Sequence, residues 1–319
     1  MFKFFRLITV LMIGTTLFGA NIIKPTKSFD AGGAVVDIVK NKQKLYVSTS
    51  ESIVTIFNLK TFDRVDTITL PKIKDFMGNT INTKIYSVDV LGKEVLVLSQ
   101  GAHGFRNIDL YNDGKIKSII SIKDKLYMAK AKFLDKDNII FALLGNDIIS
   151  YNIKTKKQNW ITQASGSKFS NFVLSEDKSQ VVVCDESGDL KIINTHNGKI
   201  TKVLSGENLD NVFNVDYKNG IIITAGQDRR SVVYNLKTNY TYYKTANFLI
   251  YSAGLSPSGK IAGYANDEDN DVTIFNTTTE KNLAVLVDNK MTITNILFLN
   301  EKELIISSDD RIINYYKLK

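Results

Sequence analysis

The stretch DLKIINTHNGK, residues Asp189–Lys199, recurs in altered form along nearly the whole sequence. Apolar residues occupy alternate positions, an asparagine usually follows, and a short polar turn comes next. This pattern is typical of a β-strand that runs into a hairpin. The related stretches are SIVTIFNLKTF from Ser52, FRNIDLYNDGK from Phe105, DIISYNIKTKK from Asp147, SVVYNLKTNYT from Ser231, DVTIFNTTTEK from Asp271 and RIINYYKLK from Arg311.

The spacing of these copies predicts the fold. The shared asparagine lies at positions 58, 112, 152, 194, 235 and 276, and Lys317 takes the seventh place, so that every interval after the first is 40 to 42 residues. A repeat of this length with several strands per copy is typical of a β-propeller. We therefore predict a single all-β domain over residues 21–319, built as one seven-bladed propeller of four-stranded blades.

The two ends of the chain are expected to meet in the last blade. The chain ends after the third predicted strand of blade 7, so we predict that Ile22–Phe29 (IIKPTKSF) supplies the fourth, outermost strand. Closing the ring in this way removes two exposed strand edges. Pro25 is compatible with an outermost strand, because one side of such a strand needs no hydrogen-bond donor.

Residues 1–20 differ from the rest of the chain. Lys3 and Arg6 precede an apolar run from Leu7 to Gly19, which predicts a secretory signal peptide. The run is shorter than a membrane-spanning helix, so we expect no membrane span in the mature chain. No cysteine follows it to carry a lipid. We expect an exported, periplasmic protein.

Charge and cysteine content narrow the classes of partner. The formal net charge is +8, but the lysines are scattered through turns, and no basic run is interleaved with aromatic residues. We therefore expect no nucleic-acid partner and a chain that is monomeric on its own. Cys184 is the only cysteine, so no internal disulfide can form, and we expect it to be a small, partly buried residue.

Residues suited to catalysis or metal binding are few. The two histidines lie in different predicted blades, and the sequence has no nucleotide-binding, nucleophile-elbow or zinc-protease motif. Asp267, Asp269 and Asp271 alternate in NDEDND and could supply oxygen ligands to calcium, but the glycine and glutamate of a calcium-binding EF-hand loop are absent. We prefer to interpret this segment as a solvated acidic turn, and we predict a non-enzyme without cofactor or metal.

The long first interval indicates an insertion. It comprises Pro71–Lys84, between the outer strand of blade 1 and the inner strand of blade 2. Phe76 and Met77 would be exposed there unless the loop folds back or a partner covers it. Two interpretations remain open, a loop that binds a partner and an ordinary tolerated insertion.

Two further loops are expected on the same face of the propeller, GAHGFR at Gly101–Arg106 and GQDRR at Gly226–Arg230. Aromatic and arginine side chains are favoured at interfaces. An Asp followed by Arg, here and at Arg311, could instead join neighbouring blades by an ion pair. Adjacent residues of a strand point to opposite faces, so we expect at least one of the two adjacent arginines to be accessible. The candidate partner-binding residues are Phe76, Met77, His103, Phe105, Arg106, Asp228, Arg229 and Arg230.

The repeat resembles a divergent WD40-type propeller in its period and polar turns, although no copy ends in Trp-Asp. Through TITLPKIKDFMGN, GAHGFRNIDLYNDGK and AGQDRRSVVYN, the chain also resembles the NapL family, accessory proteins of periplasmic nitrate reductase (Nap) systems. That resemblance implies a non-catalytic helper in nitrate respiration, which aids maturation, assembly or activity of the molybdenum enzyme, and it implies no residue roles. The alternatives are a propeller hydrolase or lactonase with calcium at its channel mouth, and a general scaffold of the cell envelope.

Overall fold

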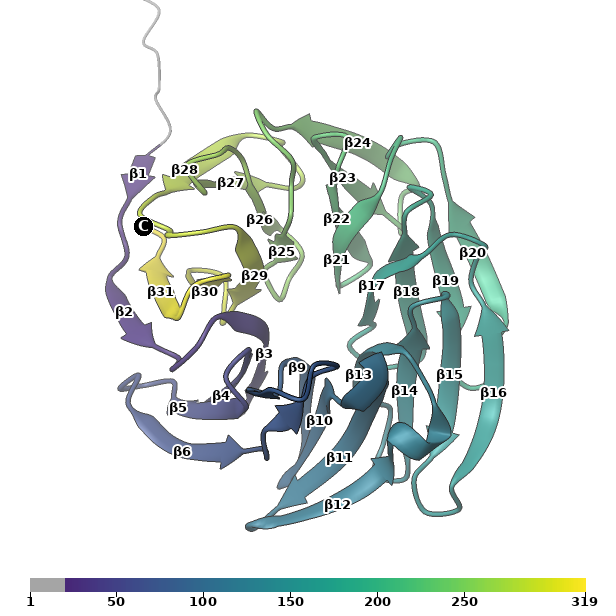
Figure 1. Cartoon of the computed structure of the whole chain (residues 1–319). Helices are drawn as coiled ribbons and strands as arrows, with labels where there is room; N and C mark the ends of the chain where they lie inside the picture. The colour runs from purple at the N-terminus through teal and green to yellow at the C-terminus, as the bar shows by residue number, and fades with distance from the viewer. Residues whose placement is uncertain (1–20) are drawn as a thin grey trace, which may run out of the picture.

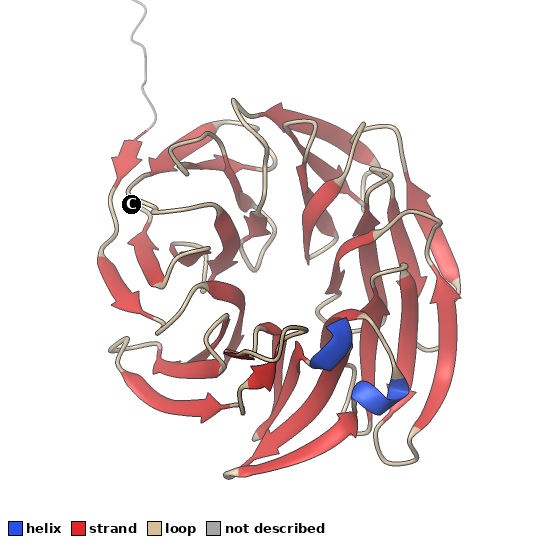
Figure 2. Cartoon of the chain, in the orientation of Figure 1, coloured by secondary structure: helices blue, strands red, loops and turns tan. Residues whose placement is uncertain are grey.

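A computed structural model describes residues 21–319 of the chain. Seven sheets stand around a central axis and form a ring (Figure 1). Each contains four antiparallel strands, which in blades 1 to 6 follow chain order from the axis outward, whereas the N-terminal segment supplies the outermost strand of blade 7 and adds a fifth strand to blade 6. Figure 2 shows that strands account for nearly all of the regular structure. The predicted seven-bladed propeller is therefore confirmed. The predicted signal peptide lies outside the described residues.

The strands of blades 1 to 3 are β3 (Val35–Asn41), β4 (Lys44–Thr49), β5 (Ile53–Asn58) and β6 (Arg64–Thr69); β9 (Ile85–Leu91), β10 (Glu94–Gln100), β11 (Arg106–Asn112) and β12 (Lys115–Ile120); and β13 (Met128–Phe133), β14 (Asn138–Leu143), β15 (Asp147–Asn152) and β16 (Lys157–Gln163). Those of blades 4 and 5 are β17 (Phe169–Leu174), β18 (Gln180–Asp185), β19 (Leu190–Asn194) and β20 (Ile200–Leu204); and β21 (Val212–Lys218), β22 (Ile221–Gly226), β23 (Arg230–Asn235) and β24 (Tyr240–Thr245). Blade 6 contains β25 (Ala253–Leu255), β26 (Ile261–Ala265), β27 (Val272–Asn276) and β28 (Asn282–Leu286), and blade 7 contains β29 (Ile293–Phe298), β30 (Glu303–Ser308) and β31 (Ile312–Lys317).

The middle strands are apolar on both faces because each blade lies between two others. In β4, Leu45 and Val47 pack toward blade 7, whereas Tyr46 between them packs toward blade 2. Alternate side chains of a strand point to opposite faces, so a strand covered on both faces needs an unbroken apolar run. In KLYVST the apolar run Leu45–Val47 meets this requirement, and Ser48 and Thr49 after it are buried as well.

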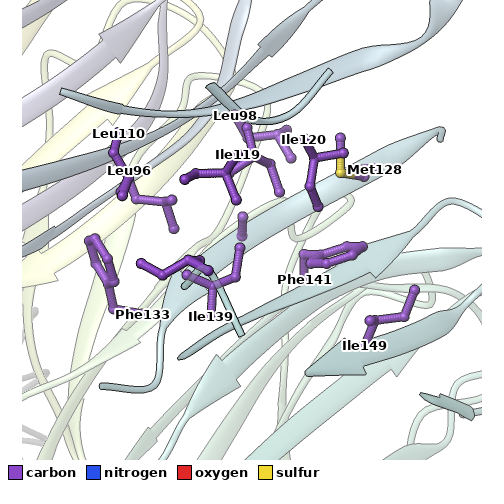
Figure 3. Close-up of a cluster of buried hydrophobic side chains, with 13 residues drawn as sticks. Leu96, Leu98, Leu110, Ile119, Ile120, Met128, Phe133, Ile139, Phe141 and Ile149 are labelled. Carbon is purple, nitrogen blue, oxygen red and sulfur yellow. The ribbon is translucent and has the colours of Figure 1, made fainter. Parts of the chain in front are cut away.

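The hydrophobic core of the described residues consists of seven clusters, one at each boundary between neighbouring blades. Figure 3 shows the cluster between blades 2 and 3. Leu96 and Leu110 face Phe133, and Ile120 lies beside Met128. Cys184 belongs to the cluster between blades 4 and 5 and is fully buried, more deeply than predicted. Burial raises the pKa of its thiol, so the thiol stays protonated.

The N-terminal segment closes the ring, but with a different strand division from the one predicted. The outermost strand of blade 7 is β2 (Lys27–Asp30), which pairs antiparallel with β31. Upstream residues form β1 (Asn21–Ile23), a fifth strand that pairs parallel with β28 of blade 6. Pro25 lies between the two strands rather than within one. Because proline has no backbone N–H, a break there sacrifices no ladder hydrogen bond.

Aromatic packing and an ion pair hold β2 in place. The Phe29 ring lies 4.8 Å from that of Phe57 and 5.2 Å from that of Phe62. The Arg311 guanidinium approaches both carboxylate oxygens of Asp30, at 2.9 and 2.6 Å, and this contact holds the pKa of Asp30 below its ordinary value. Arg311 therefore fastens the closing strand within blade 7 and does not join neighbouring blades.

Helical structure in the described residues is limited to two single-turn 3-10 helices, η1 (Ala102–Gly104) and η2 (Ile122–Asp124), which are blue in Figure 2. Within residues 21–319, no helix has the length and apolar character needed to cross a membrane.

Phe29→Ala is expected to lower the free energy of unfolding by about 3–5 kcal/mol, because it empties the aromatic site that anchors the closing strand. Ile22→Ala in β1 is the matched control. Ile22 is 72% exposed, so its loss should change stability by less than about 0.5 kcal/mol. Urea denaturation followed by circular dichroism measures both effects. A Phe29→Ala chain as stable as the native protein would contradict the closing role of β2.

Candidate functional site

The insertion between blades 1 and 2 is an ordered hairpin made of β7 (Ile73–Lys74) and β8 (Thr80–Ile81). In its turn the Asp75 carboxylate accepts hydrogen bonds from the backbone N–H groups of Met77 and Asn79, at 2.9 and 2.8 Å. Desolvation raises the pKa of Asp75, but these hydrogen bonds outweigh it and keep the pKa below its ordinary value. The turn therefore has a defined shape with an ionised carboxylate at its centre.

The tip of this hairpin presents Phe76 and Met77 to solvent, with exposed fractions of 95% and 73%. The base is fixed to the propeller, since the Thr83 N–H donates to Ser52 Oγ at 2.6 Å and the Thr83 hydroxyl donates to the Pro71 carbonyl at 2.7 Å. The loop does not fold back over its own apolar residues. Phe76 and Met77 are therefore exposed, as the sequence predicted for a loop that does not fold back.

The blade 2 loop contributes fewer free side chains than predicted. His103 is exposed, and the Phe105 ring packs 4.9 Å from that of Tyr127. Arg106 is not available to a partner, because its guanidinium lies 3.6 Å from the centre of the Tyr86 ring and donates to the Met128 carbonyl. It connects the inner strands of blades 2 and 3.

In the blade 5 loop, too, some of the predicted partner-binding residues are engaged within the fold. The half-buried Asp228 carboxylate accepts the Leu209 N–H at 2.8 Å, which fastens the connection from blade 4 to blade 5. The Arg230 guanidinium lies 4.4 Å from the centre of the Tyr243 ring and donates to the Glu207 carbonyl at 2.8 Å.

Of the two adjacent arginines in this loop, only Arg229 is exposed, but the reason differs from the predicted one. Arg229 lies in the turn with φ +63°, and β23 begins only at Arg230, so the two do not alternate along a strand. The accessible candidates in the two loops are therefore His103 and Arg229.

The three loops share one face of the ring but do not form one compact patch. The hairpin and the blade 2 loop are neighbours, joined by the Gln100 N–H, which donates to the Lys84 carbonyl at 2.9 Å. Blade 5 lies across the central opening (Figure 1). The residue missed beside the blade 2 loop is Tyr127, which is 48% exposed and packs on Phe105. The sequence could have indicated its exposure, because Tyr127 lies between the polar segment KDK, residues 123–125, and an inner strand.

The acidic NDEDND segment is held by its own turn. The Asp267 carboxylate accepts the Asp271 N–H at 3.0 Å, and Asn266 donates to its other oxygen at 3.1 Å. Desolvation, with help from Asp267 and Asp269, raises the pKa of Asp271. Among residues 21–319, no three histidine, cysteine or acidic side chains are grouped so that they could hold a metal ion.

The central channel contains a feature that the sequence analysis missed. In six inner strands a β-bulge leaves one residue unpaired, and the residue after the bulge is polar. In blade 6, Ser252 takes the same place, since its carbonyl accepts the Ala265 N–H at 3.1 Å. We call these seven residues the polar ring: Asp37, Ser87, Lys130, Asn171, Asn214, Ser252 and Asn295. Aligning the inner strands with one another would have revealed them.

Arg106→Ala should lower the free energy of unfolding by about 1–3 kcal/mol, because it removes the stacking on Tyr86 and a charged hydrogen bond. Arg229→Ala is the control, with an expected change below about 0.5 kcal/mol for an exposed side chain. Thermal unfolding of both variants distinguishes an arginine that supports the fold from a free one. Equal melting temperatures for the two would show that Arg106 is dispensable for stability.

Comparison with protein-family models and with curated proteins gives no significant match for this chain.

Proposed function

We propose that this chain is a non-catalytic interaction platform that binds another protein through the hairpin tip, Phe76 and Met77. The observation that carries the proposal is the exposure of these two large apolar side chains on a turn with a fixed shape. Exposed apolar residues on ordered loops are favoured at interaction sites. The rigid turn also lowers the entropy that is lost on binding.

The two side chains have complementary properties for this role. Phenylalanine offers a large, flat apolar area, and methionine adapts its unbranched chain to irregular surfaces. His103 is exposed on the neighbouring blade 2 loop, and Tyr127 is exposed just before β13, beside Phe105 of that loop. Both add polar groups. A surface with an apolar centre and polar surroundings is the usual anatomy of a protein interface.

For the partner, we propose a component of a periplasmic nitrate reductase, whose maturation, assembly or activity the platform would aid. This rests on the resemblance of the chain to the NapL family and on the predicted signal peptide, from which we expect a periplasmic location. The hydrolase alternative gains no comparable support, because the Asp267 carboxylate already serves as the acceptor of its own turn.

The double variant Phe76→Ser, Met77→Ser is expected to bind the purified catalytic subunit of a periplasmic nitrate reductase at least about tenfold more weakly than the native chain. The physical reason is the loss of the apolar area that the partner would bury, a loss typical of interface hot spots. Biolayer interferometry measures the affinity. Circular dichroism should show an unchanged melting temperature, because neither side chain packs against the propeller.

The matched control is Ile161→Ser, Val203→Ser. Both residues are about half exposed on the outer strands β16 and β20, far along the chain from the hairpin. Native affinity in the control and weak binding in the hairpin variant would support the proposal. If both double variants bind like the native chain, the hairpin is not the contact. If the native chain does not bind the catalytic subunit, the nitrate reductase partner is wrong.

A further inference from the structure

A cavity of about 360 Å³ lies in the central channel, and residues from all seven blades line it. Five residues of the polar ring are among them: Asp37, Lys130, Asn214, Ser252 and Asn295. Small-molecule sites in proteins typically have volumes of roughly 300–1,000 Å³ and combine an apolar lining with a few polar groups. The cavity therefore has the size of a small-molecule site.

The ionisable side chains of the lining do not balance in charge. Four lysines face three aspartates, which leaves one positive charge without a counterpart: Lys130, Lys132, Lys178 and Lys218 against Asp37, Asp89 and Asp216. Lys132 pairs with Asp37 at 2.9 Å, and Lys218 pairs with Asp216 at 3.4 Å. Lys178 donates to a backbone carbonyl at 2.8 Å. A buried charge without a counterion is costly, so this excess favours an anion.

Among the described residues, neither Lys178 nor Lys130 makes an ion pair, and Lys130 is the one whose ammonium group also contacts no backbone carbonyl. Among the described residues, its ammonium group donates only to the side-chain oxygen of Asn171, at 2.7 Å, and makes no ion pair. It lies two residues before Lys132 on β13, so both side chains belong to the same face of that strand. A bound carboxylate would pair with Lys130 as Asp37 pairs with Lys132.

The surroundings of Lys130 make its charge sensitive to a ligand. Burial lowers its pKa to about 8, and the like charge of Lys132 lowers it as well. Asp37 of β3 and Asp216 of β21 oppose this shift, whereas the Cys184 thiol of β18 is protonated and carries no charge. A bound anion would favour the charged form and raise the pKa again.

The lining also contains a buried hydroxyl without a hydrogen-bond partner in the described residues. The Ser252 side chain is fully buried, and its hydroxyl makes no hydrogen bond within the described residues. Buried polar groups are normally hydrogen-bonded, and an unpaired one costs stability unless a ligand or water satisfies it. Ser252 precedes β25, which lies on a different side of the central opening from β13 (Figure 1).

The rest of the lining is apolar and indicates the body of the ligand. Phe172, Val173, Leu297 and Phe298 contribute to the cavity wall. One unneutralised cation fits a single negative charge, and these side chains fit a hydrocarbon group beside it. We propose that the central channel binds a small organic monocarboxylate, with the carboxylate at Lys130 and a hydrogen bond from Ser252. The proposal is independent of the hairpin interface.

Isothermal titration calorimetry of the native chain with pentanoate tests this site. We expect binding of pentanoate but not of pentanamide, which has nearly the same shape without the charge. Lys130→Met should weaken binding by about tenfold or more, the effect of losing a charged hydrogen bond. Lys117→Met on β12 is the control, since that exposed lysine is far from the channel and should leave the affinity unchanged.

The pH dependence provides a second measurement. Pentanoate is ionised throughout, whereas Lys130 loses its proton as the pH rises through about 8, so affinity should fall about tenfold between pH 7 and pH 9. Lys130→Met should abolish this dependence, and because it removes a buried charge it is not expected to unfold the chain. Equal affinity of the native and Lys130→Met chains would overturn the proposal. Binding of inorganic phosphate in place of pentanoate would also overturn it, in favour of an inorganic anion.

Discussion

Apolar packing between neighbouring blades is the interaction on which the rest of this structure depends. A four-stranded blade has two apolar faces and too few residues to bury either of them alone. Each face is covered by the next blade, as Leu45 and Tyr46 of one strand show by packing in opposite directions. Every boundary in the ring therefore needs both of its blades, and the described core is divided among the seven boundaries rather than gathered at a centre.

The same constraint explains why the ends of the chain meet. Without β2, the edge of blade 7 would be unpaired and the aromatic site around Phe57 and Phe62 would be open. The residues that complete this blade are separated by almost the whole sequence, so the ring is closed by contacts of very large sequence separation. Such contacts carry a loop-closure entropy cost, which the packing of Phe29 and the ion pair of Asp30 with Arg311 help to offset.

A ring that is rigid for these reasons offers two surfaces of different chemistry. On one face, the hairpin places Phe76 and Met77 in solvent while its base is hydrogen-bonded to blade 1. Along the axis, the inner-strand bulges bring polar residues together in the channel, where, among the described residues, Lys130 makes no ion pair and the Ser252 hydroxyl makes no hydrogen bond. The first surface is apolar and open, which suits a protein. The second is a charged hollow on the axis, which suits a small anion.

The sequence alone determined the repeat, the blade number and most strand positions, because alternation of apolar residues and polar turns are local properties that each copy displays. It also located the insertion that carries Phe76 and Met77. The tertiary structure alone decided which candidate side chains are free. Arg106 and Arg230 look as accessible as Arg229 in sequence, yet both stack on aromatic rings from other strands. The split of the N-terminal segment at Pro25 and the polar ring were likewise decided by partners distant in the chain. The local sequence shows which residues are apolar. Strand pairing, stacking and charge balance depend on residues distant in the chain that the closed ring places beside them.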